Sequence, residues 1–247
     1  MTRFDAEDGA PAAPAWLPRF HTDGFALIAG VVPGDRVHAL LAALEAAEDS
    51  AGALRRESVY AIRSLLEAVP AVRDLARSPR VRALVEPVLG PHAFAVRGIL
   101  FDKTPDANWK VAWHQDLTIA VRERREVEGF GPWSEKAGVV HVQPPAYVLE
   151  RMVTVRLNLD PCGPENGPVN VIAGSHRHGR LSVDEVQRRR TGEPAVSTCL
   201  GAGGVLLMRP LLLHASSPST SPAHRRVVHL EFAAGELPGG LEWHGRW

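Results

Sequence analysis

Three side chains in this sequence have the types and the spacing needed to bind one metal ion. A single residue separates His114 from Asp116 in the stretch Trp-His-Gln-Asp, and His214 ends an apolar run far downstream. On an extended strand, residues i and i+2 point to the same face, so the imidazole of His114 and the carboxylate of Asp116 can reach one ion. Two histidines and one carboxylate form the facial triad typical of non-haem Fe(II) oxygenases, which leaves coordination positions open.

The histidine–carboxylate pair alone is a weak signal, because a His-x-Asp sequence occurs by chance in many proteins. A lone histidine is more often a core or surface residue. Two other residues strengthen the interpretation. His214 ends an apolar strand, where a buried imidazole needs a polar partner or a metal. Arg225 lies eleven residues later, and its guanidinium could bind the carboxylate of an α-keto acid through two hydrogen bonds.

The composition is typical of a packed globular protein. The chain has 247 residues, of which 45% are hydrophobic, and its 28 basic and 28 acidic residues give a formal net charge of zero. That balance argues against nucleic-acid or membrane partners. Two cysteines, Cys162 and Cys199, are too few for a disulfide framework. We read no signal peptide and no membrane-spanning segment, so we expect a cytoplasmic protein.

The elements that would position these residues change character along the chain. Residues 1–18 are rich in Ala, Pro and acidic side chains, and we expect them to be disordered. After a short element over residues 20–32, apolar spacing predicts helices over 35–48, 61–76 and 79–89. From residue 93 onward the pattern favours short strands, over residues 93–103, 109–118, 148–160, 169–172, 205–208, 211–215 and 226–232.

Short strands with Gly/Pro turns after a helical block predict a mainly β, α+β fold, a double-sheet jelly roll braced by helices. We expect one such domain over residues 19–247. Residues 122–143 form a long insertion before the strand at 148–160, and long loops in compact domains are often functional lids.

Several motifs together resemble the phytanoyl-CoA dioxygenase family of Fe(II)/2-oxoglutarate oxygenases, over about residues 20–232. The motifs are His114-Gln115-Asp116, Asn166-Gly167-Pro168, Gly174-Ser175-His176, and His214 with Arg225. The resemblance implies a cupin-like double-stranded β-helix with His114, Asp116 and His214 as iron ligands. It also implies that Arg225 binds the distal carboxylate of 2-oxoglutarate, that Gln115 and Ser216 lie near this co-substrate, and that O2 is consumed.

The reaction implied by the resemblance is hydroxylation of a small-molecule metabolite with release of succinate and CO2. Arg156 stands where family members commonly have a bulky aromatic residue, and it could bind a substrate anion or pair with Asp160. Trp109 and Lys110 precede the metal motif and are further candidates for substrate binding. Lys136, in the expected lid, could attract an anion as Lys110 could, although solvated lysines are the simpler interpretation of both.

Two other functions remain open on the sequence alone. A non-catalytic β-helix protein could bind the metal or 2-oxoglutarate without turnover, and a cupin-like enzyme could use a metal without a keto acid. Arg226 competes with Arg225 for the co-substrate, but adjacent residues of a strand face opposite ways and the spacing favours Arg225. The sequence specifies neither the substrate nor the oligomeric state.

Overall fold

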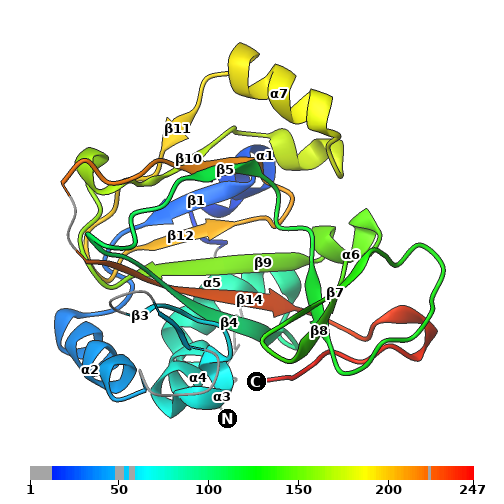
Figure 1. Cartoon of the computed structure of the whole chain (residues 1–247), viewed down its shortest axis with the longest axis horizontal. Helices are drawn as coiled ribbons and strands as arrows, with labels where there is room; N and C mark the ends of the chain where they lie inside the picture. Colours follow the sequence, from blue (N-terminus) through cyan, green and yellow to red (C-terminus); the bar gives the residue numbers. More distant parts are fainter. Residues whose placement is uncertain (1–12, 48–52, 56–58, 222–223) are drawn as a thin grey trace, which may run out of the picture.

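Two antiparallel sheets face each other across a cavity, and helices cover the outer face of the larger sheet (Figure 1). This computed structural model describes residues 13–47, 53–55, 59–221 and 224–247. The arrangement is the mainly β jelly roll that the sequence predicts, so the prediction of fold class is confirmed. No helix in the described ranges has both the length and the apolar character needed to cross a membrane.

The large sheet has seven strands in the order β1-β12-β9-β14-β4-β3-β2, and the small sheet has four in the order β11-β10-β13-β5. The strands of the large sheet are β1 (Phe25–Ile28), β2 (Ala53–Arg55), β3 (Val59–Ile62), β4 (Phe94–Lys103), β9 (Met152–Asn158), β12 (Val205–Met208) and β14 (Arg225–Ala233). Those of the small sheet are β5 (Val111–His114), β10 (Val169–Val171), β11 (Val196–Ser197) and β13 (His214–Ser216). A third sheet, ordered β6-β8-β7, contains β6 (Ile119–Val121), β7 (Trp133–Lys136) and β8 (Val139–Val142).

The α-helices fall mostly in the first third of the chain. They are α1 (Leu17–Asp23), α2 (Gly34–Glu45), α3 (Leu65–Ala68), α4 (Pro70–Arg77), α5 (Pro79–Leu89), α6 (Ala146–Glu150) and α7 (Val183–Gly192). Apolar residues of α2, α3, α4 and α5 pack on one face of the large sheet and form the main core. This packing leaves the opposite face of the sheet free to line the cavity.

Successive side chains of the central strands point alternately into this core and into the cavity. On β14, Val228, Leu230 and Phe232 are buried in the core. The intervening His229 and Glu231 line the cavity. The same period of two holds on β9 and β4, because successive side chains of a strand point to opposite faces. A strand of the large sheet therefore supplies apolar packing to one side and polar groups to the other.

The boundaries differ from the expected ones where proline intervenes. The helix expected over residues 61–76 is divided into the end of β3, α3 and α4. Val69 has an extended backbone because it precedes Pro70, the first residue of α4. Residues 148–160 begin with the end of α6 before β9 starts at Met152. Of the segment expected to be disordered, residues 1–12 lie outside the described residues, and α1 already begins at Leu17.

The expected lid, residues 122–143, is partly a β-hairpin. Strands β7 and β8 pair antiparallel through Lys136 and Val139. The two residues between them, Ala137 and Gly138, both have positive φ, at 51° and 76°. Such a two-residue turn matches the twist of the flanking strands and closes the hairpin tightly. The segment is thus more regular than the long loop that the sequence indicated.

Gly98 on β4 allows α3 to approach the sheet closely. A Cβ atom at this position would lie 2.8 Å from Cγ of Leu66 and 3.3 Å from Cδ2 of Leu230. We predict that Gly98→Ala lowers the free energy of unfolding by about 1–3 kcal/mol, because the core cannot accept the extra methyl group without shifting. Urea denaturation measures the change. Gly34→Ala is the matched control, since no atom lies within 4 Å of its Cβ position; equal stabilities of the two variants would contradict the prediction.

Candidate functional site

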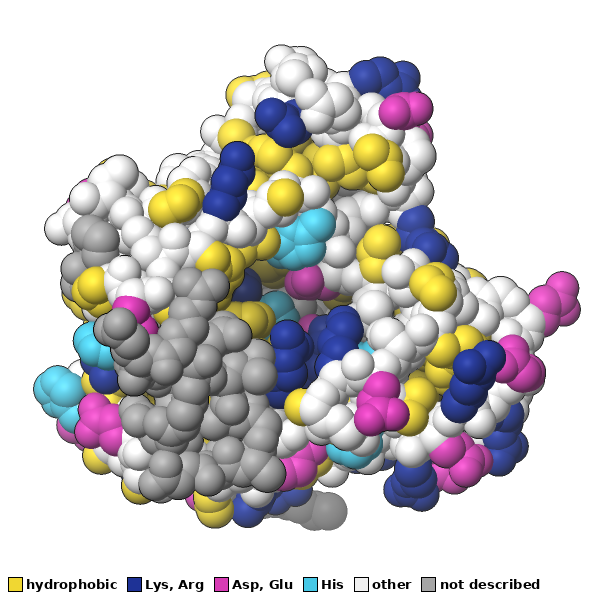
Figure 2. Space-filling view, viewed as in Figure 1, with side chains coloured by type: hydrophobic (Ala, Val, Ile, Leu, Met, Phe, Trp, Pro, Cys, Tyr) yellow, Lys and Arg dark blue, Asp and Glu magenta, His cyan; other side chains and the backbone are white. Residues whose placement is uncertain are grey.

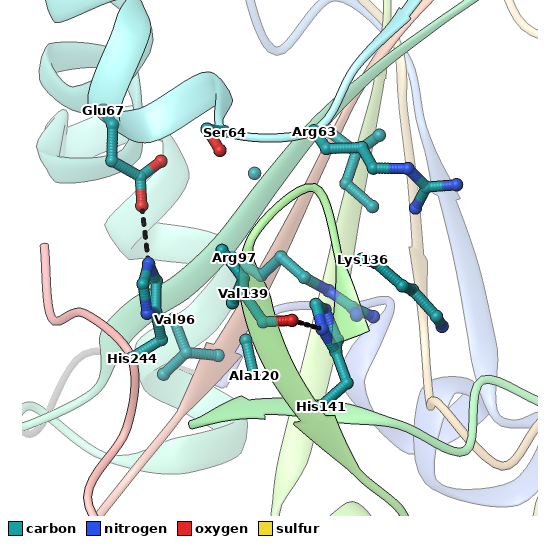
Figure 3. A pocket seen from close by; sticks show the side chains of 12 residues that line it. Arg63, Ser64, Glu67, Val96, Arg97, Ala120, Lys136, Val139, His141 and His244 are labelled. Carbon is teal, nitrogen blue, oxygen red and sulfur yellow. Dashed lines mark hydrogen bonds and ion pairs between the residues drawn. The ribbon is translucent and has the colours of Figure 1, made fainter. Parts of the chain in front are cut away.

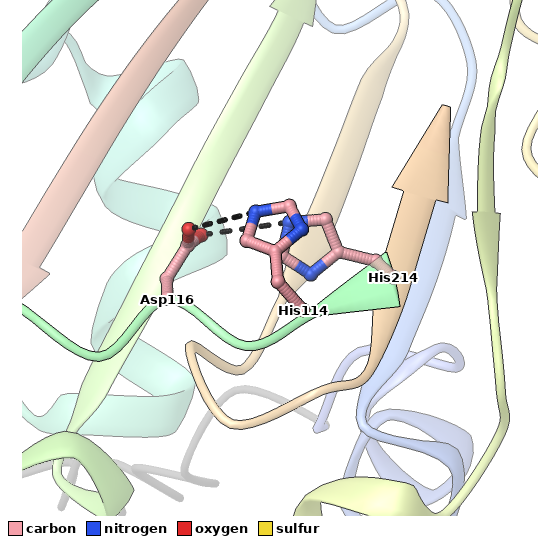
Figure 4. A group of neighbouring side chains, drawn as sticks. All are labelled: His114, Asp116 and His214. Atoms are coloured by element: carbon pink, nitrogen blue, oxygen red, sulfur yellow. Dashed lines mark ion pairs between the residues drawn. The ribbon is translucent and has the colours of Figure 1, made fainter. Parts of the chain in front are cut away.

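His114, Asp116 and His214 converge between the two sheets (Figure 4). His114 ends β5 and His214 begins β13, and the two residues are direct partners in the antiparallel pairing of these strands. Their ring centroids are 4.2 Å apart. Asp116 follows β5, and one donor atom from each of the three side chains lies within 4.8 Å of the others. The spacing seen in the sequence therefore yields a compact group of metal-ligand atoms.

Backbone hydrogen bonds orient both imidazoles. Nδ1 of His114 lies 2.8 Å from the carbonyl oxygen of Ala112, and Nδ1 of His214 lies 2.9 Å from that of Leu212. A carbonyl can only accept, so each Nδ1 carries the proton and each Nε2 presents a lone pair. Both Nε2 atoms face Asp116, at 3.7 Å from Oδ1 for His114 and 3.8 Å from Oδ2 for His214. These distances are too long for hydrogen bonds.

The charge of Asp116 is stabilised by its surroundings. Burial alone raises the pKa of this carboxyl group, but His214 and His229 help to hold it well below its usual range. Burial lowers the pKa of His214 to about 4, against the opposing effect of Asp116. Near neutral pH, Asp116 is therefore an anionic carboxylate beside the neutral imidazole of His214. Oδ2 of Asp116 is buried and has no hydrogen-bond partner among the described residues, which is costly unless a cation binds there.

A cavity of about 280 Å³ opens in front of these three residues. Figure 2 shows a hollow near the centre of this face, with His and Asp/Glu side chains inside it and Lys/Arg side chains at its rim. The walls come from both sheets, with Phe101 and Trp109 supplying aromatic surface. A cavity of this size accommodates small molecules rather than a polymer.

Cross-strand pairs of polar residues form one wall of the cavity. Along β14, the direct partners are Arg225 with Lys103, His229 with Arg156, and Glu231 with Arg97. Arg156 contacts Nδ1 of His229 at 2.8 Å, and Nε2 of His229 lies 3.1 Å from Glu231. Glu231 in turn forms an ion pair with Arg97. The chain of contacts fixes the positions of these side chains across three strands.

At one end of this wall, Arg225 is only 4% exposed. Its guanidinium donates to the carbonyl of Gly167, which also accepts from Oγ of Ser216 at 3.1 Å. Nε of Arg225 is buried without a hydrogen-bond partner in the described residues. Nζ of the fully buried Lys103 donates to Oγ of Ser216 at 2.7 Å. Burial, together with the charge of Arg225, lowers the pKa of Lys103 to about 7.

The Asn-Gly-Pro motif explains how this end is assembled. Gly167 has φ of 60°, and a Cβ atom there would lie 2.5 Å from the carbonyl oxygen of Ser217. Only glycine allows this approach. The carbonyl of Gly167 can then meet both Arg225 and Ser216. The Gly-Ser-His motif supports the backbone beside the site, since Oγ of Ser175 accepts from the backbone N–H of Leu213, next to His214.

Several expected site residues lie elsewhere. Gln115 does not line the cavity, because it alternates with the two ligand positions; its side chain binds the backbone of Gly179, Leu181 and Leu211. Lys110 is exposed and does not line the cavity. Asp160 pairs with Arg226, not with Arg156. Of the other expected site residues, Arg225, Ser216, Arg156 and Trp109 line the cavity.

Sequence reasoning missed three polar residues of the wall. Arg97 lies on the cavity face of β4, and His229 and Glu231 lie on that of β14. His229 and Glu231 are hydrogen-bonded to each other within this wall. Charged residues at every second position of a buried strand were the available signal, because they cannot face an apolar core.

The phytanoyl-CoA dioxygenase (PhyH) family model matches residues 20–227. This chain belongs to the phytanoyl-CoA dioxygenase family. It is therefore a non-haem oxygenase that depends on Fe(II) and 2-oxoglutarate and uses O2, and the expected resemblance is confirmed. Like the family, it acts on small molecules. A search of curated proteins found no match.

Solved structures support the family assignment at the level of the fold. The non-haem α-ketoglutarate-dependent carbocyclase SnoK from nogalamycin biosynthesis is 16% identical, with a TM-score of 0.70 over 92% of this chain and 85% of that one. AviO1 from Streptomyces viridochromogenes Tue57 is 25% identical, with a TM-score of 0.67 over 92% and 97%. The epimerase SnoN, solved with Fe3+, α-ketoglutarate and nogalamycin RO, is 18% identical, with a TM-score of 0.66 over 90% and 89%.

A buried histidine next to this site makes stability depend on pH. Burial lowers the pKa of His141, on β8, to about 4, whereas the pKa of a histidine in the unfolded chain is about 6.5. Protonation thus favours the unfolded state, and stability is lost as pH falls from about 6.5 to about 4. In the metal-free protein, we predict that His141→Asn reduces this loss by up to about 3 kcal/mol, measured by urea denaturation across that range. Identical pH profiles for the variant and the natural protein would contradict the prediction.

Proposed function

We propose that His114, Asp116 and His214 bind the Fe(II) of this oxygenase. The observation that carries the proposal is the Asp116 carboxylate, whose buried Oδ2 atom has no hydrogen-bond partner among the described residues. Nε2 of His114 faces its Oδ1 atom, and Nε2 of His214 faces its Oδ2 atom. Two imidazoles and one carboxylate on one side of an ion suit Fe(II) and leave the cavity side open. When bound, the iron supplies the O2 chemistry that protein side chains cannot perform.

We further propose that Arg225 binds the distal carboxylate of 2-oxoglutarate, with Ser216 beside it. Support comes from the unpartnered Nε of Arg225 and from the excess of positive charge at this end of the wall. The buried cations Lys103 and Arg156 have no acidic hydrogen-bond partner in the described structure, so an anionic co-substrate would relieve their mutual repulsion. A guanidinium binds a carboxylate through two parallel hydrogen bonds, which sets the orientation of the molecule.

The proposed reaction is hydroxylation of a small-molecule metabolite. One oxygen atom of O2 enters the substrate as a hydroxyl group and the other enters succinate, with CO2 released from 2-oxoglutarate. The protein orients the substrate and excludes bulk water through the walls of the cavity. Trp109 and Arg156 line the cavity, and we assign them to the substrate side. Hydrogen bonding to His229 holds the guanidinium of Arg156 in place.

We propose that residues 19–247 act as one oxygenase domain, with residues 122–143 as a lid beside the cavity. The hairpin of β7 and β8 supports this role, because Lys136 lies close enough to Arg97 and Asp116 to respond to their charges. A cytoplasmic location agrees with two cysteines that form no disulfide, Cys162 and Cys199.

The metal assignment predicts that His114→Ala and Asp116→Ala each abolish iron binding and the substrate-independent turnover of 2-oxoglutarate. Iron content after anaerobic reconstitution and succinate release measure the two effects. The exposed His178, which does not line the cavity, provides the control His178→Ala. Normal iron content and turnover in either ligand variant would refute the assignment.

The co-substrate assignment predicts that Arg225→Gln raises the KM for 2-oxoglutarate by about 30- to 150-fold, equivalent to losing about 2–3 kcal/mol of charged hydrogen bonding. Arg226→Gln is the matched control on the opposite face of β14, where it loses ion pairs with Asp160 and Glu45 that lie outside the cavity. We expect its KM to stay within about twofold, as its side chain is outside the cavity. Equal KM values for the two variants would rule out Arg225 as the carboxylate ligand.

A further inference from the structure

We propose that the substrate of this oxygenase carries an anionic group, a carboxylate or phosphate, that binds between Arg63 and Lys136. This inference rests on the proposed function of the neighbouring metal cavity and extends it to the substrate. Arg63 lies just after β3, and Lys136 ends β7. The two residues therefore come from segments that are distant in sequence and that both lie outside the metal and co-substrate strands.

Arg63 and Lys136 line a side pocket that adjoins the metal cavity (Figure 3). The pocket measures about 30 Å³, which is room for about two water-sized groups, such as the oxygen atoms of an oxyanion, but not for a whole metabolite. Arg97 and Ile99 line both this pocket and the metal cavity. In Figure 3 the side chains of Arg63, Arg97 and Lys136 extend in the same direction. A molecule in the cavity could thus place one charged end here and its remainder near the metal site.

The acidic groups around this pocket do not pair with Arg63 or Lys136. Glu231 pairs with Arg97, and Glu67 lies 3.5 Å from Nε2 of His244. Neither Arg63 nor Lys136 forms a hydrogen bond or an ion pair with any residue that the structure describes. Two cationic side chains therefore line the same small space, and no acidic residue of the described chain forms an ion pair with either of them.

The electrostatics of Lys136 agree with this arrangement. Burial lowers the pKa of its ammonium group, and the positive charges of Arg97 and Arg63 lower it further. Glu231 and Asp116 act in the opposite direction, so the ammonium group also lies within reach of the metal site's charge. Holding like charges together is unfavourable, and an oxyanion between them would relieve the repulsion.

The register of the large sheet separates this pocket from the proposed co-substrate site. Arg225 pairs with Lys103 at one end of β14, and Glu231 pairs with Arg97 six residues further along. Six residues of strand span about 20 Å. A five-carbon diacid held by Arg225 is too short to reach Arg63 as well. The side pocket is therefore assigned to the substrate rather than to 2-oxoglutarate.

Inorganic phosphate is the probe for this site. The protein is loaded with Mn(II) and saturated with 2-oxoglutarate, so that no turnover occurs and Arg225 is occupied. Phosphate affinity is measured by calorimetry, and Mn(II)-induced broadening of the ³¹P resonance reports whether phosphate lies near the metal. We expect saturable binding with broadening, and at least a tenfold loss of affinity in Arg63→Gln/Lys136→Gln.

The matched control is Arg188→Gln/Arg190→Gln, which removes the same charge from two exposed positions on α7. Equal phosphate affinity in the two double variants, or no saturable binding by the natural protein, would overturn the inference. Failure of the proposed function has a different signature: Mn(II) then does not bind the protein, which its electron paramagnetic resonance spectrum reports. Calorimetry on the same variants still decides the anion site in that case.

Discussion

The pairing of His114 with His214 across β5 and β13 is the contact on which the site depends. It brings together residues that are a hundred positions apart, with ring centroids at 4.2 Å. Gln115, between the two ligand positions of the Trp-His-Gln-Asp stretch, stabilises this register from the opposite face: its amide donates to the carbonyl of Leu211, just before β13. The backbone N–H of Asp116 likewise donates to Pro210. A one-residue slip would turn each ligand away from the cavity, so these hydrogen bonds protect the metal geometry as much as the fold.

The large sheet imposes a second constraint, because its central strands must satisfy an apolar core and a charged cavity at once. Leu230 packs beneath the helices while its neighbours His229 and Glu231 face the cavity. Charged groups in such a position are costly unless they are paired. The contacts Arg156–His229 and Glu231–Arg97 meet that requirement in the middle of the wall and at one end. At the other end, Lys103 and Arg225 are left without an acidic partner in the described structure, and it is there that an anionic ligand gains most.

Much of this arrangement could be predicted from the sequence. The convergence of His114, Asp116 and His214 could be predicted from a period of two and from one histidine at the end of an apolar run, and the spacing of Arg225 from that histidine favoured its place in the cavity. The same period of two places Gln115 on the opposite face of the strand, a consequence that the resemblance to the family did not reveal. The division of residues 61–76 escaped prediction because its apolar spacing is helical on both sides of Val69. Alternating charges could have indicated that Arg97 and Glu231 face a cavity, but their pairing joins β4 and β14, which are far apart in sequence, and no local pattern contains it.

The distribution of these residues over the fold explains why the chemistry is easier to infer than the substrate. The groups proposed for iron and 2-oxoglutarate lie on paired strands whose register leaves little freedom. Arg63 and Lys136 lie at the margins, one beside a helix and the other at the turn of a hairpin. Connecting segments tolerate changes in sequence and length that a paired strand does not. The same metal and co-substrate site can therefore be combined with different residues around the edge of the cavity. The substrate must be inferred from the charge of those residues rather than from the motifs that identify the family.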